Sequence, residues 1–232
     1  MIKHRPLNKL CSEDTGWLKA KRHFSPGRSD DRAWRGWGAL RIWNDDEIAP
    51  GAGFPPHSHA NMEIITYVRE GAVTHRDSLG NEGRTEVGDV QVMSAGTGIR
   101  HSEYNLEDEP TAIFQLWIIP TRRGGDPGWD TRPFPQGEGA GHFVTLASGI
   151  DGDADALPIR ADARVLGATL KAGETAEYRL APNRRAYLVP AKGAVEVNGV
   201  RIEARDGAAI ENERVLTVTA LDDAEIVLAD VS

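Results

Sequence analysis

Glycine and proline interrupt this chain so often that long regular helices have little room to form. The 232 residues include 25 glycines and 13 prolines, and both residue types mark turns. Between them lie short β-branched or alternating runs, such as residues 64–68, 112–119 and 215–218. Runs of this kind are typical of strands, whereas the apolar spacing of a helix is hard to find. The sequence therefore predicts an all-β protein built as a sandwich or barrel.

The clearest single element is a hairpin at residues 195–202, which read Val-Glu-Val-Asn-Gly-Val-Arg-Ile. Asn198 and Gly199 form the strongest short hairpin signal, because both positions of such a turn need a positive φ. The alternating residues on either side predict two short antiparallel strands.

A weak internal repeat suggests that the chain holds two similar barrels in tandem. Residues 67–90 and 187–208 both run strand, glycine turn, strand, loop, strand, acidic glycine turn, strand. A chance alignment of β-hairpins is the alternative. Because glycine and proline cluster between the repeats, we predict a first barrel in residues 1–122, a linker in residues 123–141 and a second barrel in residues 142–232.

Charge and composition exclude several classes of protein. Lys and Arg number 27 against 35 Asp and Glu, a formal net charge of −8, which disfavours direct nucleic-acid binding. The longest nearly uncharged apolar run, residues 111–120, is shorter than the roughly 20 residues that span a bilayer. Cys11 is the only cysteine, so an intramolecular disulfide and a cysteine-based zinc cluster are excluded. With no secretory signal visible either, we expect a cytoplasmic protein without membrane or nucleic-acid partners.

The histidines point to a metal site in the first half of the chain. None of the seven lies after His142. His57 and His59 are two residues apart, so on a strand both would face the same side, about 6–7 Å apart at Cα. His101 and Glu103 repeat that spacing with a carboxylate. Facing each other inside a barrel, the two pairs would present three imidazoles and one carboxylate, a ligand set that suits Fe, Ni, Co, Mn, Cu or Zn.

The other histidines have a plainer interpretation. We expect all four to be surface or hydrogen-bonded residues rather than metal ligands. They are His4, His23, His75 and His142.

Longer motifs make the sequence resemble a known family. Residues 51–71 resemble the first cupin motif, and residues 88–105 resemble the second. The spacing from Glu63 to Gly71 is one residue longer than in most cupins, and Gly96 replaces the usual proline. These departures, with the run Met-Ser-Ala-Gly-Thr-Gly-Ile-Arg-His-Ser-Glu-Tyr-Asn, closely resemble the pirin family, nearest to bacterial pirin-like proteins described as quercetin 2,3-dioxygenases. Further matching segments are residues 44–46, 53–59, 62–67 and 115–118.

The resemblance is strong over most of residues 1–120 and weaker beyond. It implies two tandem cupin, or jelly-roll, barrels (a bicupin) with one divalent metal in the N-terminal barrel. The absence of histidine after residue 142 fits a second barrel without metal. Carried over residue by residue, the implied metal ligands are His57, His59, His101 and Glu103.

The identity of the carboxylate ligand has two interpretations. The general cupin pattern names Glu63, and strand parity alone does not exclude it. We favour Glu103, because the pirin match at residues 101–103 is complete. Glu63 is then expected to support the site from behind the ligands or to belong to a turn.

Two functions follow from the resemblance. The first is a metal-dependent dioxygenase that opens the heterocyclic ring of a flavonol such as quercetin with O₂ and releases carbon monoxide. The metal would act as Lewis acid and template, and Glu103 would accept the 3-hydroxyl proton as general base. The alternative is a non-enzymatic metal-containing protein that regulates or binds another protein, as some pirins are thought to do. We expect a monomer, because no self-complementary patch is visible in the sequence.

Overall fold

The computed structural model describes residues 1–24, 34–136 and 141–232. In these residues the chain forms 22 strands and the short 3-10 helix η1 (Leu7–Lys9). The all-β expectation is confirmed. No helix in the described ranges is long and apolar enough to cross a membrane.

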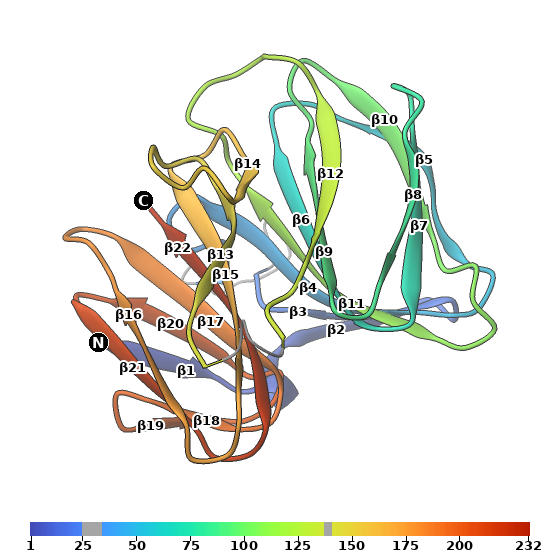
Figure 1. The fold of residues 1–232 in the computed structure, drawn as a ribbon. Coiled ribbons are helices and arrows are strands. Elements are labelled where there is room, and N and C mark those ends of the chain that lie inside the picture. The colour runs from blue at the N-terminus through green and yellow to red at the C-terminus, as the bar shows by residue number, and fades with distance from the viewer. Residues whose placement is uncertain (25–33, 137–140) are drawn as a thin grey trace.

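The strands form two barrels that lie side by side, each made of a seven-stranded and a four-stranded sheet (Figure 1). The sheets of the first barrel have the orders β12-β9-β6-β11-β4-β3-β2 and β5-β10-β7-β8. Its strands are β2 (Cys11–Asp14), β3 (Leu18–Arg22), β4 (Leu40–Ile48), β5 (Gly53–His59), β6 (Glu63–Glu70), β7 (Ala72–Asp77), β8 (Glu82–Glu86), β9 (Asp89–Ser94), β10 (Ile99–Tyr104), β11 (Thr111–Ile118) and β12 (Gly128–Pro133).

The second barrel repeats this arrangement. Its sheets have the orders β1-β20-β17-β22-β15-β13-β14 and β16-β21-β18-β19. Its strands are β1 (Ile2–Arg5), β13 (Val144–Ser148), β14 (Leu157–Pro158), β15 (Ala163–Leu170), β16 (Thr175–Arg179), β17 (Arg185–Lys192), β18 (Val195–Val197), β19 (Val200–Ile202), β20 (Gly207–Glu211), β21 (Val215–Ala220) and β22 (Ala224–Val231). The predicted hairpin is confirmed: β18 pairs with β19 across Asn198 and Gly199, whose φ angles are 45° and 83°.

The sheets differ from the predicted domain division at two places. Strand β1 pairs with β20, so the N-terminus lies among the strands of the second barrel (Figure 1). Strand β12, inside the segment predicted as a linker, pairs with β9 of the first barrel. Both are edge strands, and each covers backbone donors and acceptors that would otherwise stay unpaired. Residues 137–140 of that segment lie outside the described residues.

The two seven-stranded sheets pack face to face, and a shared apolar core fills the junction. Trp43 of β4 lies at its centre, with ring centroids 5.8 Å from Phe114 of β11 and 5.4 Å from Tyr187 of β17. The Tyr187 hydroxyl is 2.8 Å from Nδ1 of His23. Burial lowers the pKa of His23 to about 3, so this imidazole is a neutral hydrogen-bonding group of the junction.

We predict that Trp43→Ala destabilises the whole chain, because the indole fills space between two barrels. The expected loss is about 3–5 kcal/mol in the free energy of unfolding, measured by chemical denaturation. Leu221→Ala is the matched control, since Leu221 is 37% exposed on the second barrel and should change stability by less than about 0.5 kcal/mol. Equal losses in the two variants would contradict a shared core.

Candidate metal centre

Three histidines converge because of how two strands pair. His57 and His59 face the same side of β5, and His101 lies on β10, directly opposite His57 in the antiparallel register. The ring centroids of the three imidazoles are 4.5–5.1 Å apart. One ring nitrogen from each lies within 4.8 Å of the others. His57 and His101 are cross-strand neighbours, and His59 lies two residues beyond His57. The three therefore form a single group of nitrogen donors.

The nitrogens available in this group have the chemistry that a metal ion requires. Nε2 of His59 and Nε2 of His101 are buried without a hydrogen-bond partner. Nδ1 of His57 is bonded at 2.8 Å to the carbonyl oxygen of Pro55, which leaves its Nε2 free to bind an ion. Buried polar atoms rarely stay unpaired. The residues present therefore fit a divalent metal bound by three imidazoles.

The electrostatic surroundings keep at least two of these rings neutral. Burial lowers the pKa of His59 to about 4, and the neighbouring His57 adds to the shift. Burial lowers the pKa of His101 to about 3, again with contributions from the other imidazoles. A neutral imidazole has a free lone pair, so near neutral pH neither ring needs to lose a proton before it binds a metal.

Glu103 lies beside the histidines but is held by other groups. A register shift in the β5–β10 ladder falls between His101 and Glu103. The carboxylate is fully buried, and its two oxygens accept hydrogen bonds from Nε2 of Gln91 at 2.6 Å and Nε2 of Gln115 at 2.8 Å. Burial raises its pKa, while the Gln115 bond and the nearby His75 and His57 oppose that shift. Within the described residues, the donor atoms grouped within 4.8 Å are those of the three histidines, without Glu103.

Two tryptophans fix the direction of both amides. Nε1 of Trp129 donates to Oε1 of Gln91 at 3.2 Å, and Nε1 of Trp117 donates to Oε1 of Gln115 at 3.0 Å. An indole nitrogen is a donor only, so each amide must accept with its oxygen and donate with its nitrogen. Both nitrogens then face Glu103. The carboxylate is therefore surrounded by donors, which favours its ionised form.

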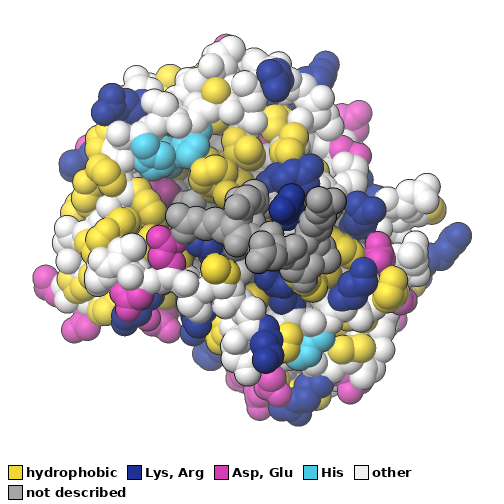
Figure 2. Space-filling model, turned by 180° about the vertical axis from the view of Figure 1, so that it is seen from behind, with side chains coloured by type: hydrophobic (Ala, Val, Ile, Leu, Met, Phe, Trp, Pro, Cys, Tyr) yellow, Lys and Arg dark blue, Asp and Glu magenta, His cyan; other side chains and the backbone are white. Residues whose placement is uncertain are grey.

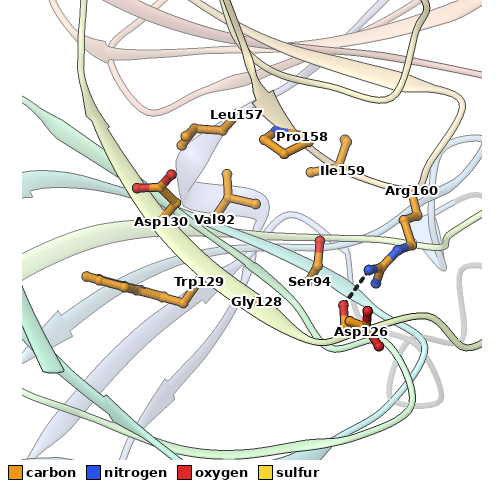
Figure 3. A pocket seen from close by; sticks show the side chains of 10 residues that line it. All are labelled: Val92, Ser94, Asp126, Gly128, Trp129, Asp130, Leu157, Pro158, Ile159 and Arg160. Carbon is orange, nitrogen blue, oxygen red and sulfur yellow. Dashed lines mark hydrogen bonds between the residues drawn. The ribbon is translucent and has the colours of Figure 1, made fainter. Parts of the chain in front are cut away.

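Glu63, the first residue of β6, lies outside the histidine cluster. Its side chain points to the face of β6 that also carries Ile65 and Tyr67, both in the junction core. The hydroxyl of Ser94 and the backbone N–H of Arg160 both donate to its carboxylate. Ser94 and Arg160 line a cavity of about 270 Å³ at the junction, with walls from both barrels (Figure 3). Glu63 thus belongs to the barrel junction, and the histidine cluster does not include it.

Five supporting residues of the site were not predicted from the sequence: His75, Gln91, Gln115, Trp117 and Trp129. His75 was expected to be a surface or hydrogen-bonded histidine, and it is a buried, hydrogen-bonded one. A signal for it exists, because His75 and Asp77 are a third pair of ligand-type residues at i, i+2 spacing on a strand. Gln115 and Trp117 fall in segment 115–118 of the pirin resemblance. Gln91 and Trp129 carry no comparable signal, and Trp129 lies in the segment expected to be a linker.

The histidine site opens toward solvent. His57 and His59 are half-buried, whereas His101 is buried beneath them. One face of the molecule shows histidine side chains at the surface with hydrophobic side chains beside them (Figure 2). The half-buried rings of Phe54 and Trp117 flank the site, with centroids 6.4 Å from His57 and 4.9 Å from His59. An aromatic molecule approaching the site would therefore meet aromatic neighbours.

Two tandem cupin barrels with a histidine cluster in the first define a metal-binding bicupin. Residues 4–118 match the family described as Pirin, and residues 145–231 match the quercetinase C-terminal cupin domain. The chain belongs to the pirin family, as its motifs predicted.

Curated relatives and solved structures extend this comparison over the whole chain. A pirin-like protein of Caulobacter vibrioides is 66% identical over 230 residues, 99% of each chain. A quercetin 2,3-dioxygenase of Escherichia coli is 38% identical over 231 residues, 99% of this chain and 98% of that one. The crystal structure of Escherichia coli YhhW has a TM-score of 0.93 at 37% identity, covering 100% of this chain and 98% of that chain. The YhhW complex with nickel(II) has a TM-score of 0.91 at 38% identity, covering 100% and 99%.

We predict that the protein binds one divalent metal ion per chain, with every ligand before residue 142. His57→Ala and His101→Ala should each abolish stoichiometric nickel(II) binding, because each removes one of three converging nitrogens. Elemental analysis after dialysis measures this. His142→Ala, which alters an exposed histidine outside the cluster, should keep its metal. Two tightly held ions per wild-type chain would contradict a single site.

Proposed function

We propose that this chain is a metal-dependent dioxygenase that cleaves the heterocyclic ring of a flavonol, such as quercetin, with O₂. The observation that carries the proposal is the group of three imidazoles with unpaired nitrogens, placed beside a buried carboxylate and open to solvent next to aromatic rings. The 38% identical Escherichia coli relative bears the name quercetin 2,3-dioxygenase. The nickel(II) complex of YhhW, which is 38% identical, supports transition-metal binding by a protein of this fold.

Each residue of the site has a role in this proposal. His57, His59 and His101 would hold the ion, with Glu103 beside them as the fourth ligand. When bound, the ion would supply Lewis acidity and a template for the oxygens of the flavonol. Glu103 would accept the proton of the 3-hydroxyl group, a task that requires an ionised carboxylate with a free lone pair.

The surroundings of Glu103 favour that role. Gln91 and Gln115 each donate one hydrogen bond to it, so each carboxylate oxygen keeps a second lone pair for a proton or an ion. Burial raises the pKa of Glu103 above its ordinary value, which makes it a better base than an exposed carboxylate. Phe54 and Trp117 would border the flavonol rings on either side of the histidines.

The compartment and the state of assembly of the protein are also part of the proposal. A reducing cytoplasm fits the single, exposed cysteine, Cys11, which forms no intramolecular disulfide, and we propose a monomer there. Sedimentation of the purified protein measures the state of assembly directly.

The deciding experiment is an assay of metal-loaded protein. Protein loaded without oxygen with Fe, Ni, Co, Mn, Cu or Zn is mixed with quercetin and O₂, and quercetin loss and carbon monoxide release are followed. Release of carbon monoxide by at least one metal form, absent in His101→Ala, would support the proposal. Loaded protein that releases none with any metal would refute it and favour the non-enzymatic, protein-binding alternative.

We predict that Glu103→Gln keeps much of its metal but loses most flavonol turnover, about 10²–10⁴-fold, because the amide lacks a basic oxygen. The new amide also places one N–H donor opposite the donors of Gln91 and Gln115, which is unfavourable. The melting temperature of the variant is therefore measured in parallel. Glu63→Gln is the control, because it removes a buried charge at the junction instead. Near wild-type turnover in Glu103→Gln would exclude the base role. Metal loss in Glu63→Gln but not in Glu103→Gln would make Glu63 the ligand.

A further inference from the structure

His75, a histidine outside the cluster of three, lies behind His101. His75 of β7 is fully buried, and β7 pairs with β10 on the side away from β5. Nδ1 of His75 is 3.5 Å from Nδ1 of His101, at the long end of the hydrogen-bond range. Nε2 of His75 is 3.0 Å from Oδ2 of Asp77. The ring stacks on Trp129, with centroids 4.8 Å apart and planes 7° from parallel, so it cannot turn freely.

Asp77 is anchored independently of His75. Its Oδ1 accepts from the backbone N–H groups of Leu79 at 2.9 Å and Asn81 at 3.1 Å. Its Oδ2 accepts from Nδ2 of Asn81 at 3.0 Å. These three donors fix the carboxylate within the turn that follows β7. An ionised carboxylate only accepts hydrogen bonds, so it imposes a direction on the histidine bonded to it.

The Asp77 carboxylate thereby fixes which ring nitrogen carries the hydrogen, first in His75 and then in His101. Facing Asp77, Nε2 of a neutral His75 must carry the hydrogen, and Nδ1 of His75 must accept. Nδ1 of His101 then carries the hydrogen that points at His75. Nε2 of His101, which is buried and has no hydrogen-bond partner, keeps its lone pair toward His57 and His59.

The opposite tautomer of His101, with its hydrogen on Nε2, is unfavourable in this structure. A hydrogen on Nε2 of His101 would point into the cluster of imidazoles, where that atom has no acceptor. Nδ1 of His101 and Nδ1 of His75 would then face each other as two lone pairs. An unmade hydrogen bond on a buried polar group is costly, so only one arrangement satisfies all three residues.

We propose that Asp77 and His75 are positioning residues that set which nitrogen of His101 is free to bind metal. They touch neither the ion nor the substrate and set this nitrogen through the ring of His101. Outer partners of this kind orient a ligand ring and tune its affinity for the metal. The inference about metal affinity rests on the proposed metal centre. The inference about the position of the hydrogen holds for the metal-free protein as well.

The test is the substitution Asp77→Asn in the full-length protein. The amide can still accept from Leu79 and Asn81 with its oxygen, while its nitrogen takes the place of Oδ2 and donates toward His75. His75 must then accept with Nε2 and donate with Nδ1, so the hydrogen of His101 moves to Nε2. A similar exchange of tautomers accounts for the effect of replacing the aspartate of a serine-protease triad by asparagine, a known example.

The first readout is the ring-nitrogen chemical shifts of metal-free, isotope-labelled protein, at a pH where the imidazoles are neutral. Protonated and unprotonated ring nitrogens give well-separated signals. We expect Nδ1–H on His101 in the wild type and Nε2–H in Asp77→Asn. The second readout is nickel(II) affinity by calorimetry, expected to fall about 10- to 100-fold in Asp77→Asn.

Asn81→Ala is the matched control, because it removes the same Nδ2–Oδ2 bond that Asp77→Asn loses but keeps the carboxylate. It should keep the wild-type tautomer and affinity. If Asp77→Asn does not fold, His75→Phe keeps a ring against Trp129 and removes the acceptor. It should lose nickel(II) affinity to a similar extent.

Nε2–H on wild-type His101, or an unchanged tautomer in Asp77→Asn, would overturn the proposal. So would equal nickel(II) affinity in wild type and His75→Phe. None of these outcomes depends on flavonol turnover. A protein with the expected tautomers and affinities but without ring cleavage would uphold this inference while the proposed function fails.

Discussion

The antiparallel register of β5 and β10 is the constraint on which the candidate site depends. It sets His101 opposite His57 and brings His59 to the same face two residues further along. A slip of one residue would turn either set of side chains out of the barrel. The register shift after His101 changes the partner of the next inward residue, so Glu103 pairs with Phe54. Such irregularities re-aim a side chain within a ladder.

A polar barrel interior must satisfy its own hydrogen bonds, and this requirement links distant parts of the chain. Glu103 is bonded by two glutamines from β9 and β11, and each glutamine is oriented by an indole. Trp129 takes part twice, since it orients Gln91 and stacks on His75. Gly83 makes room for it, because a Cβ there would lie 2.2 Å from the indole ring. One residue of β12 therefore supports the surroundings of both His101 and Glu103.

The two barrels also depend on each other at the junction. Their seven-stranded sheets share one core around Trp43 and Tyr187, and β1 crosses to complete the second barrel. Glu63 stabilises this junction through Ser94 and Arg160 rather than serving the histidine site. The residue that a general cupin motif names as a ligand is thus part of the connection between the barrels in this chain.

The sequence by itself determined the strand-rich fold, the hairpin at Asn198 and Gly199, the pirin resemblance and the shared face of His57 and His59. These features depend on local turn chemistry and on i, i+2 spacing, which two residues on one strand settle between themselves. Only the tertiary structure decided the β5–β10 register that sets His101 opposite His57, the places of β1 and β12, the burial of Glu63 at the junction and the contacts of Glu103. Each depends on edge pairing or on hydrogen bonds between strands far apart in sequence. No local pattern records such partners, because they become neighbours only when the sheets close.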